Sequence, residues 1–166
     1  MRTLSVCAML AVITFHTETA IAQTPLAPPP LTTYGLPISI ENAKLAAAAA
    51  VAEAKSHGWA MAIAIVDPSG FLVYFEKLTN TQNASGDLAI AKARTSALFR
   101  RPTRVFQDAL AAGGDNLRVL GLTGVMPNAG GIPIVLGGHL IGAIGVSGGS
   151  VDQDAQVAQS GAAAVK

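Results

Sequence analysis

The stretch AMAIAIVDPSGFLVYFEK, residues 60–77, decides the fold of this 166-residue chain. Its first half is an apolar run that ends at the turn sequence DPSG, where proline presets one dihedral angle and glycine accepts a positive φ. Its second half returns with aromatic side chains that are typical of strands. The stretch therefore predicts a β-hairpin with strands at residues 60–66 and 71–77.

A second hairpin is predicted near the C-terminus, where a glycine pair at 137–138 separates the apolar residues 132–136 from 140–146. Helices are predicted before and after the two hairpins. The first begins at the N-cap Ser39 and ends at Gly58. The last begins at Ser150, with Gln153 at the spacing of a capping box.

Two more helices are predicted between the hairpins. The longer one has Ser85 as its predicted N-cap and ends before Pro102. Its predicted buried stripe consists of Leu88, Ala91, Thr95 and Leu98. A shorter helix is predicted from the N-cap Thr103 to Leu110. Because helices precede, separate and follow two hairpins, we expect an α/β domain of the α+β type, with an antiparallel sheet covered by helices.

The N-terminus has the pattern of a secretory signal. Arg2 precedes an apolar stretch, residues 4–15, that is too short to cross a bilayer as a stable helix. Residues 20–22, Ala-Ile-Ala, match the small-x-small pattern of a signal-peptidase site. We therefore expect a signal peptide at residues 1–22 and a periplasmic or secreted mature protein that has no membrane span after cleavage.

Residues 23–38 are rich in proline and are expected to form an extended tether, so that the folded domain covers residues 39–166. The only cysteine, Cys7, lies in the signal segment, which excludes disulfides and cysteine-ligated metals from the mature chain. The near balance of 11 basic and 10 acidic residues argues against nucleic acid as a partner.

Candidate binding residues gather between positions 92 and 104. Half of the mature chain's basic side chains fall here: Lys92, Arg94, Arg100, Arg101 and Arg104. Helical geometry puts Lys92 and Arg94 on opposite faces, so the five cannot all meet one ligand. The segment is either a solvated basic surface or a place where carboxylate or phosphate groups bind.

Glycines are dense between residues 121 and 149. Gly142 and Gly145 fall within a predicted strand, where a missing side chain indicates that another backbone or a ligand comes close. We expect a flat cleft or a subunit contact at these positions.

The sequence contains no catalytic triad and no motif of clustered metal ligands. The mature domain's two histidines, His57 and His139, lie at the ends of predicted elements. Asp152 and Asp154 are interpreted as carboxylates that complement the dipole at a helix start, in preference to metal ligands. An enzyme acting on a small acid would need an acid–base pair, and none is evident, so a catalytic role is not predicted.

Three segments of the chain resemble the GlcG/HbpS family of small haem-binding proteins, also called DUF336. In order along the chain they are AIAIVDPSGFLVYFEK, DLAIAKARTSALFRRPT and GGIPIVLGGHLIGAIGVSGGSVDQDAQVAQSG. The resemblance extends from Ser39 to Lys166. The positions that match the family's motifs are Lys92 and Ala93, Pro102 and Thr103, Gly130, Gly131 and Pro133, and Gly142, Gly145, Ser147 and Gly148.

The resemblance implies a profilin-like, three-layer α/β/α fold with a five-stranded antiparallel sheet and assembly into homo-oligomers. It also implies haem binding, with haem storage, buffering or sensing as the expected role and a sensor or redox protein as a possible partner. Haem needs an apolar slot, positive groups for its propionates and an axial donor. The predicted cofactor-binding residues are Lys92, Arg100, Arg101, Arg104, Thr103, Gly130 and Gly131.

The axial donor to the haem iron stays open, so no metal ligand is assigned. The options are His57, His139, Met61, Met126 and a threonine hydroxyl such as that of Thr103, and we expect that His139 is not the donor. An alternative function is a non-catalytic assembly or sensor module that binds a partner protein or another tetrapyrrole, such as a corrinoid.

We predict that the mature chain begins at Gln23, because Ala20 and Ala22 meet the requirement of signal peptidase for small residues. Intact-mass measurement on exported protein tests this expectation. A mass that still includes residues 1–22 would contradict export as a soluble protein.

Overall fold

The hairpin predicted at residues 60–77 forms as strands β2 (Ala62–Val66) and β3 (Leu72–Lys77). Its turn is held by Asp67, whose carboxylate accepts hydrogen bonds of 2.9 Å from the amides of Ser69 and Phe71. The computed structural model describes residues 32–166. The predicted signal peptide and residues 23–31 of the predicted tether therefore lie outside the described residues.

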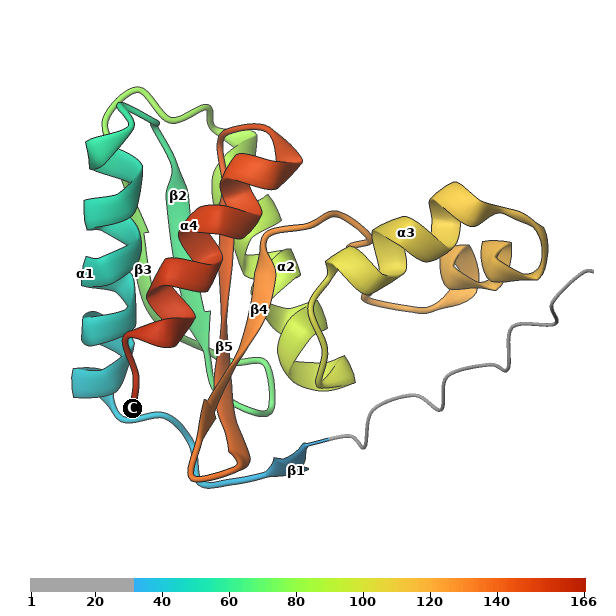
Figure 1. The fold of residues 1–166 in the computed structure, drawn as a ribbon, viewed down its shortest axis with the longest axis horizontal. Coiled ribbons are helices and arrows are strands. Elements are labelled where there is room, and N and C mark those ends of the chain that lie inside the picture. Colours follow the sequence, from blue (N-terminus) through green and yellow to red (C-terminus); the bar gives the residue numbers. More distant parts are fainter. Residues whose placement is uncertain (1–31) are drawn as a thin grey trace, which may run out of the picture.

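Five strands make one sheet (Figure 1). The second predicted hairpin forms as β4 (Gly131–Leu136) and β5 (His139–Ser147), and β5 also pairs antiparallel with β2. The fifth strand, β1 (Thr33–Tyr34), runs parallel to β5. The expectation of a purely antiparallel sheet is therefore wrong, because the chain enters the domain alongside β5 and only then turns into the first helix.

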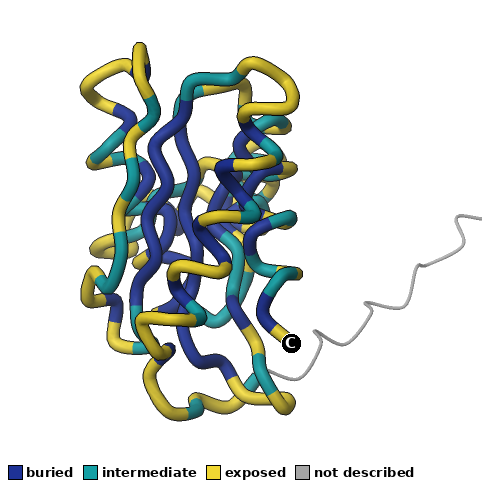
Figure 2. The backbone as a smooth tube through the Cα atoms, turned by 90° about the vertical axis from the view of Figure 1, so that its left-hand side faces the viewer, coloured by how far each residue is buried: buried dark blue, intermediate teal, exposed yellow. Residues whose placement is uncertain are grey.

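The predicted three-layer α/β/α arrangement is confirmed (Figure 1). Helices α1 (Ile40–Ser56) and α4 (Val151–Ala163) cover one face of the sheet, and α2 (Ala84–Phe99) covers the other. The central strands are buried between these layers, as Figure 2 shows. The N-caps predicted for the first and last helices are confirmed. The Ser39 hydroxyl accepts a hydrogen bond from the Asn42 amide, and Ser150 and Gln153 form a capping box.

Small residues let the helices lie close to the sheet. The buried face of α1 consists of alanines and one valine at helical spacing: Ala43, Ala46, Ala47, Ala50, Val51 and Ala54. On the opposite face of the sheet, a Cβ at Gly145 would overlap the Ala89 carbonyl oxygen and lie 2.5 Å from the Ala93 nitrogen. Gly142 is similarly enclosed by Val66 and Ile38. The expectation that another backbone comes close at these two glycines is therefore confirmed. The backbone belongs to the same domain, so the expectation of a flat cleft or a subunit contact at these positions is wrong.

The close contact with β5 also determines which face of α2 is buried. The residues of α2 that are buried are Ser85, Ala89, Lys92, Ala93, Thr95, Ser96 and Ala97. Of the predicted stripe, Thr95 is buried, but Leu98 is 45% exposed. The predicted stripe is wrong in phase because leucine is too large for the narrow space that Gly145 creates. Ser85 does not cap the helix, since α2 begins one residue earlier, after Asn83.

Between α2 and β4 the chain leaves the body of the domain as a projecting arm, residues 103–128 (Figure 1). The arm contains α3 (Arg104–Ala112), which confirms the predicted short helix, and the 3₁₀ segment η1 (Gly114–Gly121). Thr103 stands at the N-cap position of α3, but its side chain makes no capping hydrogen bond. The elements α3 and η1 pack mainly against each other. As a result the arm exposes three leucines: Leu117, Leu120 and Leu122.

The last residues of the predicted tether belong to the folded domain. The Tyr34 hydroxyl donates to the Leu98 carbonyl oxygen at 2.9 Å, at the end of α2. The amide of Gly35 donates to the Leu140 carbonyl oxygen, and Ile38 is buried in the core. These contacts attach the entering chain to both β5 and α2. Among residues 32–166, no helix has the length and apolar character needed to cross a membrane.

We expect Gly145→Ala to lower the free energy of unfolding by more than about 2 kcal/mol, because the added methyl group meets backbone atoms that cannot move aside. Denaturant titration measures this loss. The matched control is Gly121→Ala, whose Cβ meets no atom within 4 Å and which should change stability by less than about 0.5 kcal/mol. Equal stability of the two variants would contradict the packing argument.

Candidate functional site

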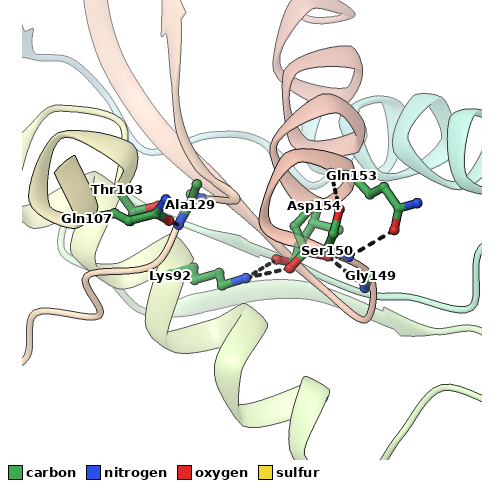
Figure 3. A network of polar contacts seen from close by, with 10 residues as sticks. Lys92, Thr103, Gln107, Ala129, Gly149, Ser150, Gln153 and Asp154 are labelled. Carbon is green, nitrogen blue, oxygen red and sulfur yellow. Dashed lines mark hydrogen bonds and ion pairs between the residues drawn. The ribbon is translucent and has the colours of Figure 1, made fainter. Parts of the chain in front are cut away.

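Lys92 and Asp154 form an ion pair inside the domain (Figure 3). Lys92 Nζ lies 2.7 Å from Asp154 Oδ2 and donates a second hydrogen bond of 3.0 Å to the Val146 carbonyl oxygen. Asp154 Oδ1 accepts from the Gly149 amide at 2.9 Å. The two side chains are only 2% and 4% exposed. The pair therefore connects α2, β5 and α4 at one buried point.

Burial raises the pKa of the Asp154 carboxyl above its ordinary value, because the charged form loses its hydration. The Lys92 ammonium and the amides of Gly149 and Gly148 oppose that rise. The interpretation of Asp154 as a carboxylate that only complements a helix start is thus incomplete. Its partner is 62 positions away, so no local pattern in the sequence reveals the pair.

Thr103, Gly130 and Gly131 form a second buried contact next to this pair. The Thr103 amide donates to the Gly131 carbonyl oxygen at 3.0 Å, and the Gly131 amide donates back to the Thr103 hydroxyl at 2.9 Å. A Cβ at Gly130 would lie 2.9 Å from Asp154 Cβ and 3.2 Å from Lys92 Nζ. The start of the arm, β4 and the ion pair meet here, and they leave no room for a side chain at Gly130 or Gly131.

The three predicted arginines do not gather with Lys92. The guanidinium of Arg100 lies over the ring of Tyr34, 5.1 Å from its centre, and that of Arg101 lies 5.8 Å from the centre of the Phe106 ring. Arg104 pairs with the exposed carboxylate of Asp152 at the start of α4. Each arginine thus contacts a different residue, and the Lys92 ammonium is paired with Asp154 in the interior. The four predicted basic residues therefore do not form one cluster.

The outward face of α2 carries a slot that the sequence did not indicate. It has a volume of ≈ 450 Å³, and it is lined by Asp87, Ile90, Ala91, Arg94 and Leu98 of α2 and by Gly124 of the arm. Pockets for small molecules usually enclose about 300–1,000 Å³ and have mainly apolar walls with few polar groups. This slot has mainly apolar walls and two charged groups, the guanidinium of Arg94 and the carboxylate of Asp87.

Two exposed aromatic residues lie near α2, one in β3 and one just before it. A Cβ at Gly70 would touch Arg94 and Leu98, and the next residue, Phe71, is 68% exposed. A Cβ at Gly86 would lie 3.5 Å from the ring of Phe75, which is also exposed. Exposed apolar side chains are thus present both in the α2 slot and near the edge strand β3.

Two of the candidate axial donors lie in the interior. Met61 and Thr103 are fully buried, and the Thr103 hydroxyl is engaged by Gly131. Met126 is only partly buried and lies two residues beyond Gly124 of the slot. Its amide donates to the Thr95 hydroxyl at 2.8 Å, which fixes this part of the arm against α2.

The two histidines lie elsewhere and have partners. His139 Nδ1 is 2.8 Å from the Thr33 hydroxyl. His57 Nε2 is 3.3 Å from Glu53 Oε1, and the His57 ring stacks on Trp59 with 4.3 Å between ring centres. Within residues 32–166, no group of three or more His, Cys, Asp or Glu side chains could hold a metal ion.

A family model described as "Haem degrading protein HbpS-like" matches residues 38–163. The chain belongs to this HbpS-like family. GlcG of Escherichia coli is 34% identical over 112 residues, which cover 66% of this chain and 81% of GlcG. The resemblance to the GlcG/HbpS family that the sequence motifs indicate is therefore confirmed.

Solved structures share the fold. A crystal structure of a double mutant of HbpS from Streptomyces reticuli has a TM-score of 0.73 and 31% identity, and the match covers 87% of this chain and 99% of that one. A crystal structure of a complex between PduOC and haem has a TM-score of 0.71 and 28% identity, over 79% of this chain and 96% of that one. The corrinoid adenosyltransferase PduO of Salmonella typhimurium is 31% identical over 122 residues, but the match covers only 35% of its length.

We expect Lys92→Met alone to destabilise the domain by about 3–5 kcal/mol, because it leaves the Asp154 carboxylate buried without its charged partner. The double variant Lys92→Met with Asp154→Leu should recover most of this loss, since no buried charge is left. Denaturant titration of the two single variants and the double variant gives the coupling energy. The matched control, Arg104→Met, breaks the exposed pair with Asp152 and should cost less than about 1 kcal/mol.

Proposed function

We propose that this chain is an exported haem-binding protein that stores, buffers or reports haem as a homo-oligomer. Membership in the HbpS-like family and the similarity to PduOC, which is known as a complex with haem, support haem as the ligand. The observation that carries the proposal is the α2 slot, an apolar surface with a guanidinium beside it.

The α2 slot has the chemistry that a haem group needs. Ile90, Ala91 and Leu98 offer an apolar wall. Arg94 supplies a cation for a propionate, and carboxylate contacts with a guanidinium are charge-assisted. Of the candidate axial donors, Met126 belongs to the arm segment next to the slot. When bound, haem supplies a redox-active iron and a strong visible absorption.

The cofactor-binding residues that were predicted from the sequence fall into two groups with different roles in this proposal. Arg100, Arg101 and Arg104 add positive charge after the end of α2. Lys92, Thr103, Gly130 and Gly131 act indirectly, because their contacts hold α2 and the start of the arm in place.

Export and assembly complete the proposal. Residues 1–22 are proposed as the signal peptide and residues 39–166 as the family domain, so that haem is met in the periplasm or outside the cell. For the homo-oligomer, the exposed leucines of the arm are a more suitable contact than the small residues of α1 and β5, which are used within the domain. Light scattering on the mature protein measures the number of subunits.

We expect haem titration of the mature protein to give a saturable Soret band, and Leu98→Asp to weaken binding at least tenfold. The substitution removes apolar wall and places a carboxylate where the propionates and the porphyrin lie. Leu45→Asp is the matched control, because Leu45 has similar exposure on α1, 49% against 45%, but lies on the other side of the sheet. Arg94→Ala should weaken binding by about ten- to a hundredfold, and the exposed Arg118→Ala should leave it unchanged.

Equal effects of Leu98→Asp and Leu45→Asp would remove the α2 slot as the haem site. A complete absence of saturable haem binding would overturn the proposed function. The same titration with a corrinoid decides the alternative of another tetrapyrrole, which the similarity to PduO favours.

A further inference from the structure

The α2 slot is elongated along its helix. Its lining residues Asp87, Ala91, Arg94 and Leu98 recur at helical spacing, so they form one stripe from the first turn of α2 to its last. At the rise of an α-helix, the distance along the axis from Asp87 to Leu98 is about 16 Å. The slot is therefore long enough to hold an extended segment of polypeptide.

The start of the described chain is held beside the Leu98 end of the slot. The Tyr34 hydroxyl donates to the Leu98 carbonyl oxygen at 2.9 Å, and Arg100 Nη1 donates to the Thr32 carbonyl oxygen at 3.4 Å. Thr32, the first described residue, is thus within the reach of a side chain that starts two positions after Leu98. The residues that precede Thr32 therefore join the domain next to the slot.

The sequence just before Thr32 has a chemistry that matches the slot. Residues 23–31, which lie outside the described residues, read QTPLAPPPL and contain no charged side chain. The three consecutive prolines favour polyproline II, a conformation without internal hydrogen bonds. The apolar side chains of this segment suit the mainly apolar walls, and its free carbonyl groups suit the exposed guanidinium of Arg94, which can only donate.

The length of this segment also matches the slot. A polyproline II chain rises about 3.1 Å per residue, so residues 23–31 span about 28 Å. The slot accounts for about 16 Å of this length, which residues 23–27 cover. The remaining length, residues 28–31, is sufficient to connect Thr32 with the Leu98 end of the slot.

Because the segment is covalently attached, even a weak contact is sufficient for it to occupy the slot. A ligand on a short linker is present at an effective concentration on the order of millimolar. The consecutive prolines restrict the free segment, so less conformational entropy is lost when it binds.

We infer that residues 23–31 dock along the α2 slot of their own domain. Residues 28–31 form the connection, residues 23–27 lie in the slot, and the Arg94 guanidinium donates to their carbonyl groups. The slot thus has an occupant within the chain, which any apolar ligand of the slot has to displace. That this ligand is haem rests on the proposed function, whereas the docking itself does not.

Disulfide formation tests the docking directly, because residues 23–166 contain no cysteine. In this chain, Thr24→Cys combined with Ala91→Cys should form an intramolecular disulfide under mild oxidation about tenfold faster than Thr24→Cys combined with Val135→Cys. Val135 is the matched control: it is exposed, and it pairs with Leu140, with which Tyr34 also pairs. It thus lies about 10 Å from Tyr34, where an undocked segment would also reach it. Intact mass after alkylation measures the fraction oxidised.

Substitutions in the slot give a second measurement. Leu98→Asp should slow the disulfide between positions 24 and 91, because it places a charge against an apolar segment, and Leu45→Asp on the other side of the sheet should not. Equal rates for the two cysteine pairs, or equal effects of Leu98→Asp and Leu45→Asp, would overturn the inference. A disulfide that joins two molecules in preference to one would also overturn it, since the segment would then dock on a second copy.

Haem titration keeps this inference distinct from the proposed function. The disulfide rates are measured without haem, so a failure of haem to bind does not alter them. Saturating haem should slow the disulfide between positions 24 and 91, because haem and the segment compete for the α2 slot. If haem binds and the rate stays the same, the α2 slot is not the haem site. If the two cysteine pairs react at equal rates, the docking is wrong and the haem titration still stands.

Discussion

The close contact between α2 and strand β5 is the constraint on which the rest of this domain depends. Gly145 has no side chain, so the backbone of α2 at Ala89 and Ala93 lies directly on the strand. Such proximity tolerates only small residues on the helix face concerned, and α2 supplies serine and alanine there. It also brings the Lys92 ammonium within reach of the Val146 carbonyl oxygen and of Asp154.

The choice of the face of α2 that is buried also determines which residues form its exposed face. Since Ala89 and Ala93 face the strand, Arg94 and Leu98 must face outward, with Ile90 between the two faces, and the α2 slot follows from that phase. The buried ion pair then holds α4 in place beside the same strand. A buried pair is weak evidence for added stability, but it specifies one arrangement, because every other position of α2 would leave a charge without its partner. The site and the core are therefore set by the same contacts.

The helices and hairpins of this fold could be predicted from the sequence better than the faces by which they pack. Turn chemistry at residues 67–70 and the capping residues Ser39 and Ser150 act locally, so both hairpins and most helices could be predicted. The parallel strand β1 could not, because a two-residue pairing with β5 leaves no periodic signal. The buried stripe of α2 was assigned to the larger apolar residues, whereas packing against a glycine selects the smaller ones. The role of Lys92 depends on Asp154, which only the tertiary fold brings near.

The short strand β1 also determines how far proteolysis can shorten the N-terminus without exposing the edge of the sheet. Thr33 and Tyr34 cover the backbone of β5 at His139 and Leu140, beyond the residues that pair with β2. Proteolysis past this point would uncover amide and carbonyl groups that pair readily with a strand of another molecule. The contact of Tyr34 with the last turn of α2, which Arg100 reinforces, therefore protects the protein against edge-to-edge aggregation.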